Sequence, residues 1–350
     1  MTLQLKAKAI ELGGAEDAEL AFEYSIESGW SDGLPIIPPT ADRVARMLAA
    51  TTRRPDEVVA TIAPRYGEAT VERAAINAVM AGCRPDYFPI LLAALEAVSD
   101  PAFNLRGIQA TTNPVGPAIV INGPVRRLVG VNCGRNALGP GNRANATIGR
   151  ALRLCLINIG GGIGGDTDKA ILGFPGKYTF CLGENEEDSP WEPLHVARGF
   201  NAEDSAVTVS AIQGTNSVLV LSGIMEDALY VIADAMMTMG NNNVIAGSGN
   251  PILFLSPGFA NLLVEQGFQT RRSVQEYFFE HARIPVEDFP AREFVPSKPM
   301  ANRAIVDGKV CVVPSPEALL VVVAGGPEPY HSTFCASIGD FRAITRKVTP

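Results

Sequence analysis

Residues 117–124 read Pro-Ala-Ile-Val-Ile-Asn-Gly-Pro, an apolar run closed by Gly-Pro. Apolar residues without polar alternation predict a strand that is buried on both faces. Two later stretches repeat this design, because 250–257 ends in Ser-Pro and 318–327 ends in Gly-Gly-Pro. Segments with the apolar spacing of helices, such as 146–157 and 227–239, lie between these runs. The sequence therefore predicts an α/β fold, internally duplicated into two lobes, with largely parallel sheets covered by helices.

The repeats divide the chain of 350 residues into four expected parts. We expect a helical and extended N-terminal segment at 1–57 and a first α/β lobe at 58–165. A Gly-rich and acidic connecting region follows at 166–205. The second lobe, with a C-terminal strand and tail, occupies 206–350. Ligands of such sheets bind beyond the carboxyl ends of the strands, so we expect a binding cleft between the two lobes.

Composition indicates a globular chain. Hydrophobic residues make up 47% and charged residues 19%, a balance that can fill a large core and excludes a disordered protein. No stretch reaches the roughly 18 apolar residues that span a bilayer, and no apolar signal segment begins the chain. We therefore expect a cytoplasmic protein without a membrane partner. Six widely spaced cysteines without a CxxC pair predict reduced thiols.

The block 101–165 contains no Asp or Glu, although the whole chain has a net charge of -8. Its charges are seven arginines: Arg106, Arg126, Arg127, Arg135, Arg143, Arg150 and Arg153. Guanidinium forks, Asn amides and glycine N–H groups are the groups that hold a small oxyanion, so the block predicts a small-molecule anionic substrate. The alternative is a basic face that pairs with acidic parts of the chain or with a sister subunit in a homo-oligomer. The negative net charge argues against nucleic acid as a partner.

Candidate substrate-binding residues come from this acid-free block, from the strand ends and from turns. They are Asp32, Asn122, Arg135, Asn142, Arg143, Asn145, Ser256 and Ser332.

Four further residues are candidates for catalysis. His331 follows the third apolar run, where it is placed to transfer a proton. Glu186 and His195 share an acidic segment; such a pair binds a metal or shares acid–base work, unless the segment is simply an exposed loop. Cys83 precedes Arg84, whose charge favours a thiolate nucleophile, although many free cysteines are just buried apolar residues. The sequence leaves the metal and the cofactor open.

Residues 160–165, Gly-Gly-Gly-Ile-Gly-Gly, satisfy the GxGxxG spacing of dinucleotide-binding loops. Such a loop needs a following helix whose N-terminus meets the pyrophosphate. Here Gly173, Pro175 and Gly176 interrupt the segment that follows. The sequence therefore favours a flexible or anion-approaching loop over a Rossmann cofactor site.

Five strings spread over most of the chain carry a family resemblance: 32–35 (Asp-Gly-Leu-Pro), 81–85 (Ala-Gly-Cys-Arg-Pro), 141–150 (Gly-Asn-Arg-Ala-Asn-Ala-Thr-Ile-Gly-Arg), 184–191 and 324–332. They resemble the UGSC-motif-associated bacterial proteins, whose small members carry selenocysteine or cysteine in a U/C-Gly-Ser-Cys loop. Members tend to be labelled thiol-disulfide oxidoreductase, so the resemblance implies redox chemistry and a small UGSC-type partner protein. No Cys-Gly-Ser-Cys occurs in this chain, so the redox label cannot be assigned to a named dithiol here, and a partner is one possible source of the thiol.

Three functions are therefore compatible with the sequence. The first is an enzyme that binds a small anionic or carbonyl compound in the inter-lobe cleft, with His331 as proton donor and Cys83 or a partner thiol as nucleophile or reductant. The second is a non-redox hydrolase or lyase that combines His331 or His195 with Glu186 or Glu187. The third is a non-catalytic subunit whose basic block docks onto an acidic partner.

Overall fold

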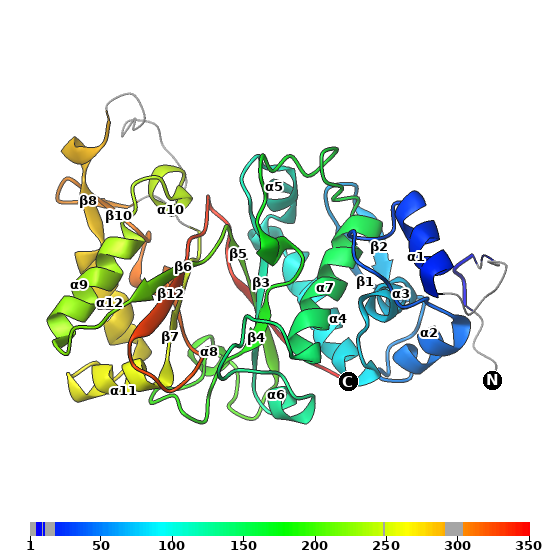
Figure 1. Cartoon of the computed structure of the whole chain (residues 1–350), viewed down its shortest axis with the longest axis horizontal. Helices are drawn as coiled ribbons and strands as arrows, with labels where there is room; N and C mark the ends of the chain where they lie inside the picture. The colour runs from blue at the N-terminus through cyan, green and yellow to red at the C-terminus, as the bar shows by residue number, and fades with distance from the viewer. Residues whose placement is uncertain (1–4, 9, 11–17, 248, 291–303) are drawn as a thin grey trace.

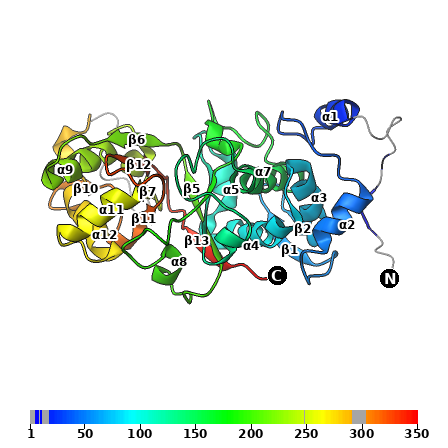
Figure 2. The same ribbon diagram turned by 60° about the horizontal axis from the view of Figure 1, so that its bottom comes forward.

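The computed structural model describes residues 5–8, 10, 18–247, 249–290 and 304–350. The chain is a mixed α/β protein with 37% helix and 18% strand, arranged around several small mixed sheets. Figure 1 shows two sheets side by side at the centre, with helices on the outer side of each. Figure 2 shows the same sequence of layers from a second direction.

The first of these sheets has the strand order β13-β5-β3-β4. Strand β3 (Gly116–Asn122) pairs in parallel with β4 (Cys181–Gly183) and antiparallel with β5 (Ala206–Ile212). Strand β13 (Ile344–Lys347) pairs antiparallel with β5 and closes that edge. The most C-terminal strand therefore belongs to the same sheet as β3.

The second sheet has the order β11-β7-β12-β6. Strand β7 (Ile252–Leu255) is parallel to β11 (Leu320–Val323) and antiparallel to β12 (His331–Cys335). Strand β6 (Asn216–Leu219) pairs antiparallel with β12. The expectation of largely parallel sheets is wrong, because each sheet contains one parallel and two antiparallel pairings. The segment 324–330 between β11 and β12 is too short for the crossover that a parallel pair needs.

The structure shows no clear duplication, and the chain passes between the two sheets twice. It leaves the first sheet after β5 to form β6 in the second, and it leaves the second sheet after β12 to form β13 in the first. The expected connecting region 166–205 contributes β4, and the expected second lobe 206–350 contributes strands to both sheets.

Helices cover the outer face of each sheet (Figure 1). On the first sheet lie α4 (Phe88–Val98) and α7 (Arg143–Asn158), and α3 (Val71–Ala81) packs against both of these helices from outside. Helix α2 (Ala41–Leu48) packs in turn against α3. Beside the second sheet lie α9 (Met225–Met236), α11 (Pro257–Glu265) and α12 (Arg271–His281). The other helices are α1 (Ala18–Glu27), α5 (Leu105–Ala110), α6 (Val125–Leu128), α8 (Leu194–Ala197) and α10 (Asn242–Ile245). The short strands are β1 (Val58–Ile62), β2 (Gly67–Thr70), β8 (Arg283–Pro285), β9 (Ile305–Val306) and β10 (Lys309–Cys311).

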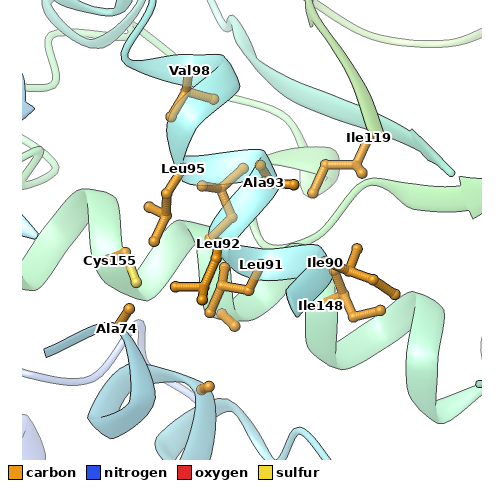
Figure 3. Close-up of a cluster of buried hydrophobic side chains, with 14 of the residues drawn as sticks. Ala74, Ile90, Leu91, Leu92, Ala93, Leu95, Val98, Ile119, Ile148 and Cys155 are labelled. Atoms are coloured by element: carbon orange, nitrogen blue, oxygen red, sulfur yellow. The ribbon is translucent and has the colours of Figure 1, made fainter. Parts of the chain in front are cut away.

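Helix α4 lies at the centre of the core of the first half. Figure 3 shows Leu91, Leu92 and Leu95 of this helix among side chains from β3, α3 and α7. Leu91 and Leu95 are fully buried and Leu92 is 2% exposed. Burying one leucine stabilises the fold by about 1.5 to 3 kcal/mol, so this helix fixes α7 firmly against the sheet.

Alternate residues of the central strands face two different cores. In β3, Ile119 and Ile121 belong to the cluster under the helices, whereas Ala118 and Val120 belong to a cluster shared with the second sheet. Rings from the two halves meet in this shared cluster, because Phe180 stacks on Phe254 with 6.3 Å between centroids. The two sheets thus pack face to face through apolar side chains.

No single helix in the described part of the chain is long and apolar enough to cross a membrane. One bent pair, Pro85–Val98 with Pro101–Ala110, satisfies the length and composition of a broken span.

Candidate functional site

Most arginines of the acid-free block meet carboxylates from other parts of the fold. The bidentate pair of Arg150 with Asp32 has both N–O distances at 2.8 Å. Arg126, only 2% exposed, donates to both Glu186 and Glu187. The remaining pairs are Arg127 with Glu187 and Arg135 with Glu328. Folding therefore neutralises much of the charge that the sequence concentrates in 101–165.

Arg153 differs from these paired arginines, because its guanidinium group is buried and forms no ion pair within the described residues. It lies on α7 and is 6% exposed. Its Nε donates to the carbonyl of Lys177 at 2.7 Å, and Nη1 donates to Oε1 of Gln109 at 3.2 Å. No carboxylate of the described residues lies within 4.0 Å of this guanidinium group, and burial lowers the pKa of Arg153, opposed by the more distant Asp168 and Asp32. Burying a charge without a partner costs several kcal/mol.

Arg153 lines a pocket of about 580 Å³. Helix α7, the Gly-rich loop that follows it and the segment up to Tyr178 form its walls, and Asp32 contributes from the N-terminal region. The lining residues are Asp32, Arg153, Ile157, Gly162, Gly164, Gly165, Asp168, Ala170, Leu172, Gly173, Phe174, Pro175, Lys177 and Tyr178. This volume is in the range of small-molecule sites.

Close packing explains the glycines at the start of the loop. A Cβ on Gly162 would lie 2.5 Å from Nε2 of Gln109, and a Cβ on Gly160 would lie 2.8 Å from the carbonyl of Ala63. Gly161 adopts φ +68°, which favours glycine. Helix α7 precedes the loop and only the single turn Pro175–Lys177 follows it within the pocket wall. Because no strand precedes it and no long helix follows, this is not the geometry of a dinucleotide fingerprint.

A second cation, Lys177, faces the same pocket. Its side chain is 16% exposed, and its Nζ lies 2.5 Å from Oδ2 of Asp168. Burial lowers the pKa of Lys177, Asp168 opposes this effect, and the charge of Arg153 adds to it. The charged groups on the lining are thus Arg153, Lys177, Asp168 and Asp32, and the last is already paired with Arg150.

Three predicted binding residues of the acid-free block support the backbone instead. The Asn142 side chain caps α7 by accepting from the N–H of Asn145 at 3.0 Å. The buried Asn145 amide donates to the carbonyls of Asn132 and Ala137. Arg143 donates from Nε to the carbonyl of Gly82 at 3.0 Å. None of the three lines the pocket beside Arg153.

Another group of predicted residues lies at strand ends, in two separate places. The amide of Asn122 donates to Glu186 at 2.9 Å, and the N–H of Gly123 donates to the same carboxylate at 2.7 Å. Ser256 follows β7 and caps α11 by accepting from Phe259. His331 is exposed at the start of β12, one position before Ser332, which pairs with Leu255. The buried hydroxyl of Ser332 has no hydrogen-bond partner in the described part of the chain.

Cys83 and His195, two of the predicted catalytic residues, are both buried. The Cys83 thiol donates to the carbonyl of Thr147 at 3.2 Å, and desolvation raises its pKa to about 12. A protonated buried thiol is a poor nucleophile. His195 is fully buried, and neither ring nitrogen has a partner among the described residues. It therefore lies within the protein and not at the surface beside Glu186 and Glu187.

Cys133 is the one cysteine that is not buried, since the other five, all described, are enclosed. Its sulfur lies 3.7 Å from Nη1 of Arg126. Burial nevertheless raises the pKa of this thiol, against the opposing charge of Arg126. In the described residues no group of three or more His, Cys, Asp or Glu is arranged to hold a metal ion.

The sequence did not indicate Lys177, Asp168 or Gln109, and Arg153 was indicated only as one of seven arginines. One signal for Arg153 was present. It interrupts the apolar stretch 151–156, Ala-Leu-Arg-Leu-Cys-Leu, in a helix whose neighbours are core residues. A charge at such a position must find a polar partner or a ligand.

Comparison with protein families, with curated proteins and with solved structures finds no match for this chain.

Proposed function

We propose that this protein is an enzyme that binds a small anionic compound in the pocket beside Arg153. One observation carries the proposal: a buried guanidinium group that forms no ion pair with a carboxylate of the described residues lines a cavity of about 580 Å³. Two of its three nitrogens donate to protein acceptors, which fixes its orientation and leaves Nη2 for a ligand. Guanidinium groups held in this way bind carboxylates and phosphates with charge-assisted hydrogen bonds.

The anion takes the place of the missing counter-charge. Replacing water around a buried guanidinium group by a bound oxyanion offsets the desolvation that lowers the pKa of Arg153. The neighbouring Lys177–Asp168 pair lies on the same wall of the pocket. It supplies a proton donor and a proton acceptor, as general acid–base catalysis requires. The non-redox enzyme class is therefore favoured at this site, with Lys177 and Asp168 in place of the His and Glu expected from the sequence.

A thiol-dependent reaction with a small UGSC-type partner is a second proposal, and Cys133 supports it. This thiol is partly accessible, and Arg126 lies beside it. A partner that brought its own reactive cysteine would meet Cys133 at the carboxyl ends of β3 and β4, because Gly183 at the end of β4 donates to the carbonyl of Asn132.

We also propose that the two halves are diverged copies of one unit, although their strands are exchanged. In both, an apolar strand leads through helices to a parallel neighbour and then to an antiparallel one: β3, β4 and β5 in the first sheet, and β7, β11 and β12 in the second. Each unit then contributes its next strand to the other sheet.

Calorimetric titration with phosphate, acetate and pyruvate tests the anion site. Loss of a charge-assisted hydrogen bond costs about 1.5 to 3 kcal/mol, so Arg153→Met should raise the Kd for the bound anion roughly 10- to 150-fold. The control is Arg106→Met, which removes an exposed arginine of the same block from α5. If all three anions bind wild type and Arg153→Met equally, or none binds wild type, the proposal fails.

A further inference from the structure

We propose that Lys177 forms an imine with the carbonyl group of a 2-oxo acid whose carboxylate is held by Arg153. The inference rests on the proposed function and names its substrate class. It combines three features of one pocket wall: an anchored cation, an amine beside it and a carboxylate in contact with that amine.

A hydrogen bond links the side chain of Arg153 to the backbone of Lys177. The carbonyl of Lys177 accepts a hydrogen bond from Nε of Arg153 at 2.7 Å, which places the turn Pro175–Lys177 beside the guanidinium group. The lysine stem runs past two glycines, since a Cβ on Gly116 would lie 3.4 Å from Cγ and one on Gly173 would lie 3.8 Å from Cδ. An anion bound at Arg153 extends its next carbon into the cavity that Lys177 also lines.

The charges on the lining select a singly charged ligand. Arg153 forms no ion pair within the part of the chain that the structure describes, whereas Lys177 is paired with Asp168 and Asp32 is paired with Arg150. One negative group on the ligand therefore balances the pocket, and a second would meet Asp168 and Asp32. A 2-oxo acid carries one carboxylate next to a neutral carbonyl group, which matches this balance better than a doubly charged phosphate ester.

An attacking amine must first lose a proton, and Asp168 is in place to accept it at 2.5 Å. The burial of Lys177 and the nearby charge of Arg153 both favour the neutral amine, because they lower its pKa. Lys169 of the same loop is a contrast, because it is exposed and its ammonium group donates to the carbonyl of Gly165 at 3.5 Å.

The proposed step balances without a further reactant. The Lys177 ammonium group gives one proton to Asp168, and the nitrogen lone pair then forms a bond to the carbonyl carbon while the carbonyl electron pair moves to oxygen. The oxygen then takes one proton directly from the nitrogen, which gives a carbinolamine. It takes a second proton from Asp168, the one that the ammonium group gave up first, and leaves as water while the nitrogen lone pair forms the C=N bond. The product is a protonated imine, and Asp168 is again a carboxylate.

Borohydride trapping tests this step. Full-length protein is incubated with pyruvate and sodium borohydride, which reduces an imine to a stable amine, and the modified residue is located by peptide mass spectrometry. We expect one adduct on Lys177, its loss in Lys177→Arg, and its retention in Lys169→Arg. Arginine keeps the pairing with Asp168 but cannot form the imine, so a melting temperature near that of wild type separates lost chemistry from lost fold.

The outcomes separate this inference from the function on which it rests. If pyruvate binds in the calorimeter but no adduct forms on Lys177, or if Lys169 and other surface lysines are labelled equally, the imine is overturned and the anion site stands. If phosphate, acetate and pyruvate all fail to bind, the anion site itself is overturned.

Discussion

Arg153 differs from the other arginines of its block in what surrounds its guanidinium group. The sequence shows seven arginines without a local acid, and it cannot show which of them meet carboxylates after folding. Arg150 pairs with Asp32, which lies 118 positions earlier in the chain, and Arg126 pairs with Glu186, which lies 60 positions later. Contacts of that separation depend on the tertiary fold. The sequence could therefore suggest an anion site only for the block as a whole, and it could not distinguish Arg135 or Arg143 from Arg153, where we propose the site.

Cys133 is expected to be the most reactive of the six cysteines toward alkylating reagents. We expect Cys133 to react with iodoacetamide before any other cysteine of the native protein, because the other five are buried. The raised pKa of Cys133 keeps it mostly protonated at neutral pH, so its labelling rate should increase as pH rises through and above the ordinary thiol range. Mass spectrometry of partly labelled protein measures the order, and Cys133→Ser should remove the fast phase. Early labelling of Cys83 would contradict the burial described above.

Among the elements, the helices were predicted better than the strand directions. The expected helix 146–157 is α7, which begins earlier because Asn142 caps it. The apolar runs 117–124 and 250–257 are indeed buried strands. Their lack of polar alternation reflects burial on both faces, which the prediction took as the sign of a parallel sheet. Here a second sheet covers the inner face, so antiparallel strands show the same pattern.

Gly162 of the Gly-rich loop lies close to Gln109, whose side chain accepts a hydrogen bond from Arg153. A pair of substitutions tests whether this close approach is needed to orient Arg153. A methyl group at Gly162 would lie 2.5 Å from Gln109 and would displace the side chain that orients Nη1 of Arg153. We expect Gly162→Ala to weaken anion binding and to cost about 1 to 3 kcal/mol of stability by overpacking. Gly164→Ala is the matched control, since its methyl group would meet open space. Titration calorimetry and urea unfolding measure both effects, and equal behaviour of the two variants would refute the coupling.

At the scale of the whole molecule, the two sheets depend on each other. An apolar cluster joins their facing sides, and the chain crosses between them after β5 and after β12. These crossings could not be predicted from the sequence, because β6 and β13 contain polar residues and lack the apolar runs of their neighbours. The expected boundary at residue 206 consequently falls within a segment that supplies both sheets.

Unfolding should therefore be cooperative across both halves. In a Trp30→Phe background, Trp191 is the remaining tryptophan, and it is buried in the cluster beneath the second sheet. Adding Leu92→Ala removes core volume from the first half at a cost of about 2 to 5 kcal/mol. We expect the urea midpoint reported by Trp191 fluorescence to fall together with the midpoint from circular dichroism. A Trp191 midpoint that stays unchanged would show that the halves unfold independently.

Crystallography with perrhenate, a singly charged oxyanion whose rhenium can be located by anomalous scattering, is the decisive test of the proposed anion site at Arg153. We predict a rhenium peak inside the pocket, within hydrogen-bonding distance of Nη2 of Arg153, and its absence in Arg153→Met. Perrhenate bound at exposed arginines such as Arg106, with no peak in the pocket, would refute the proposed site.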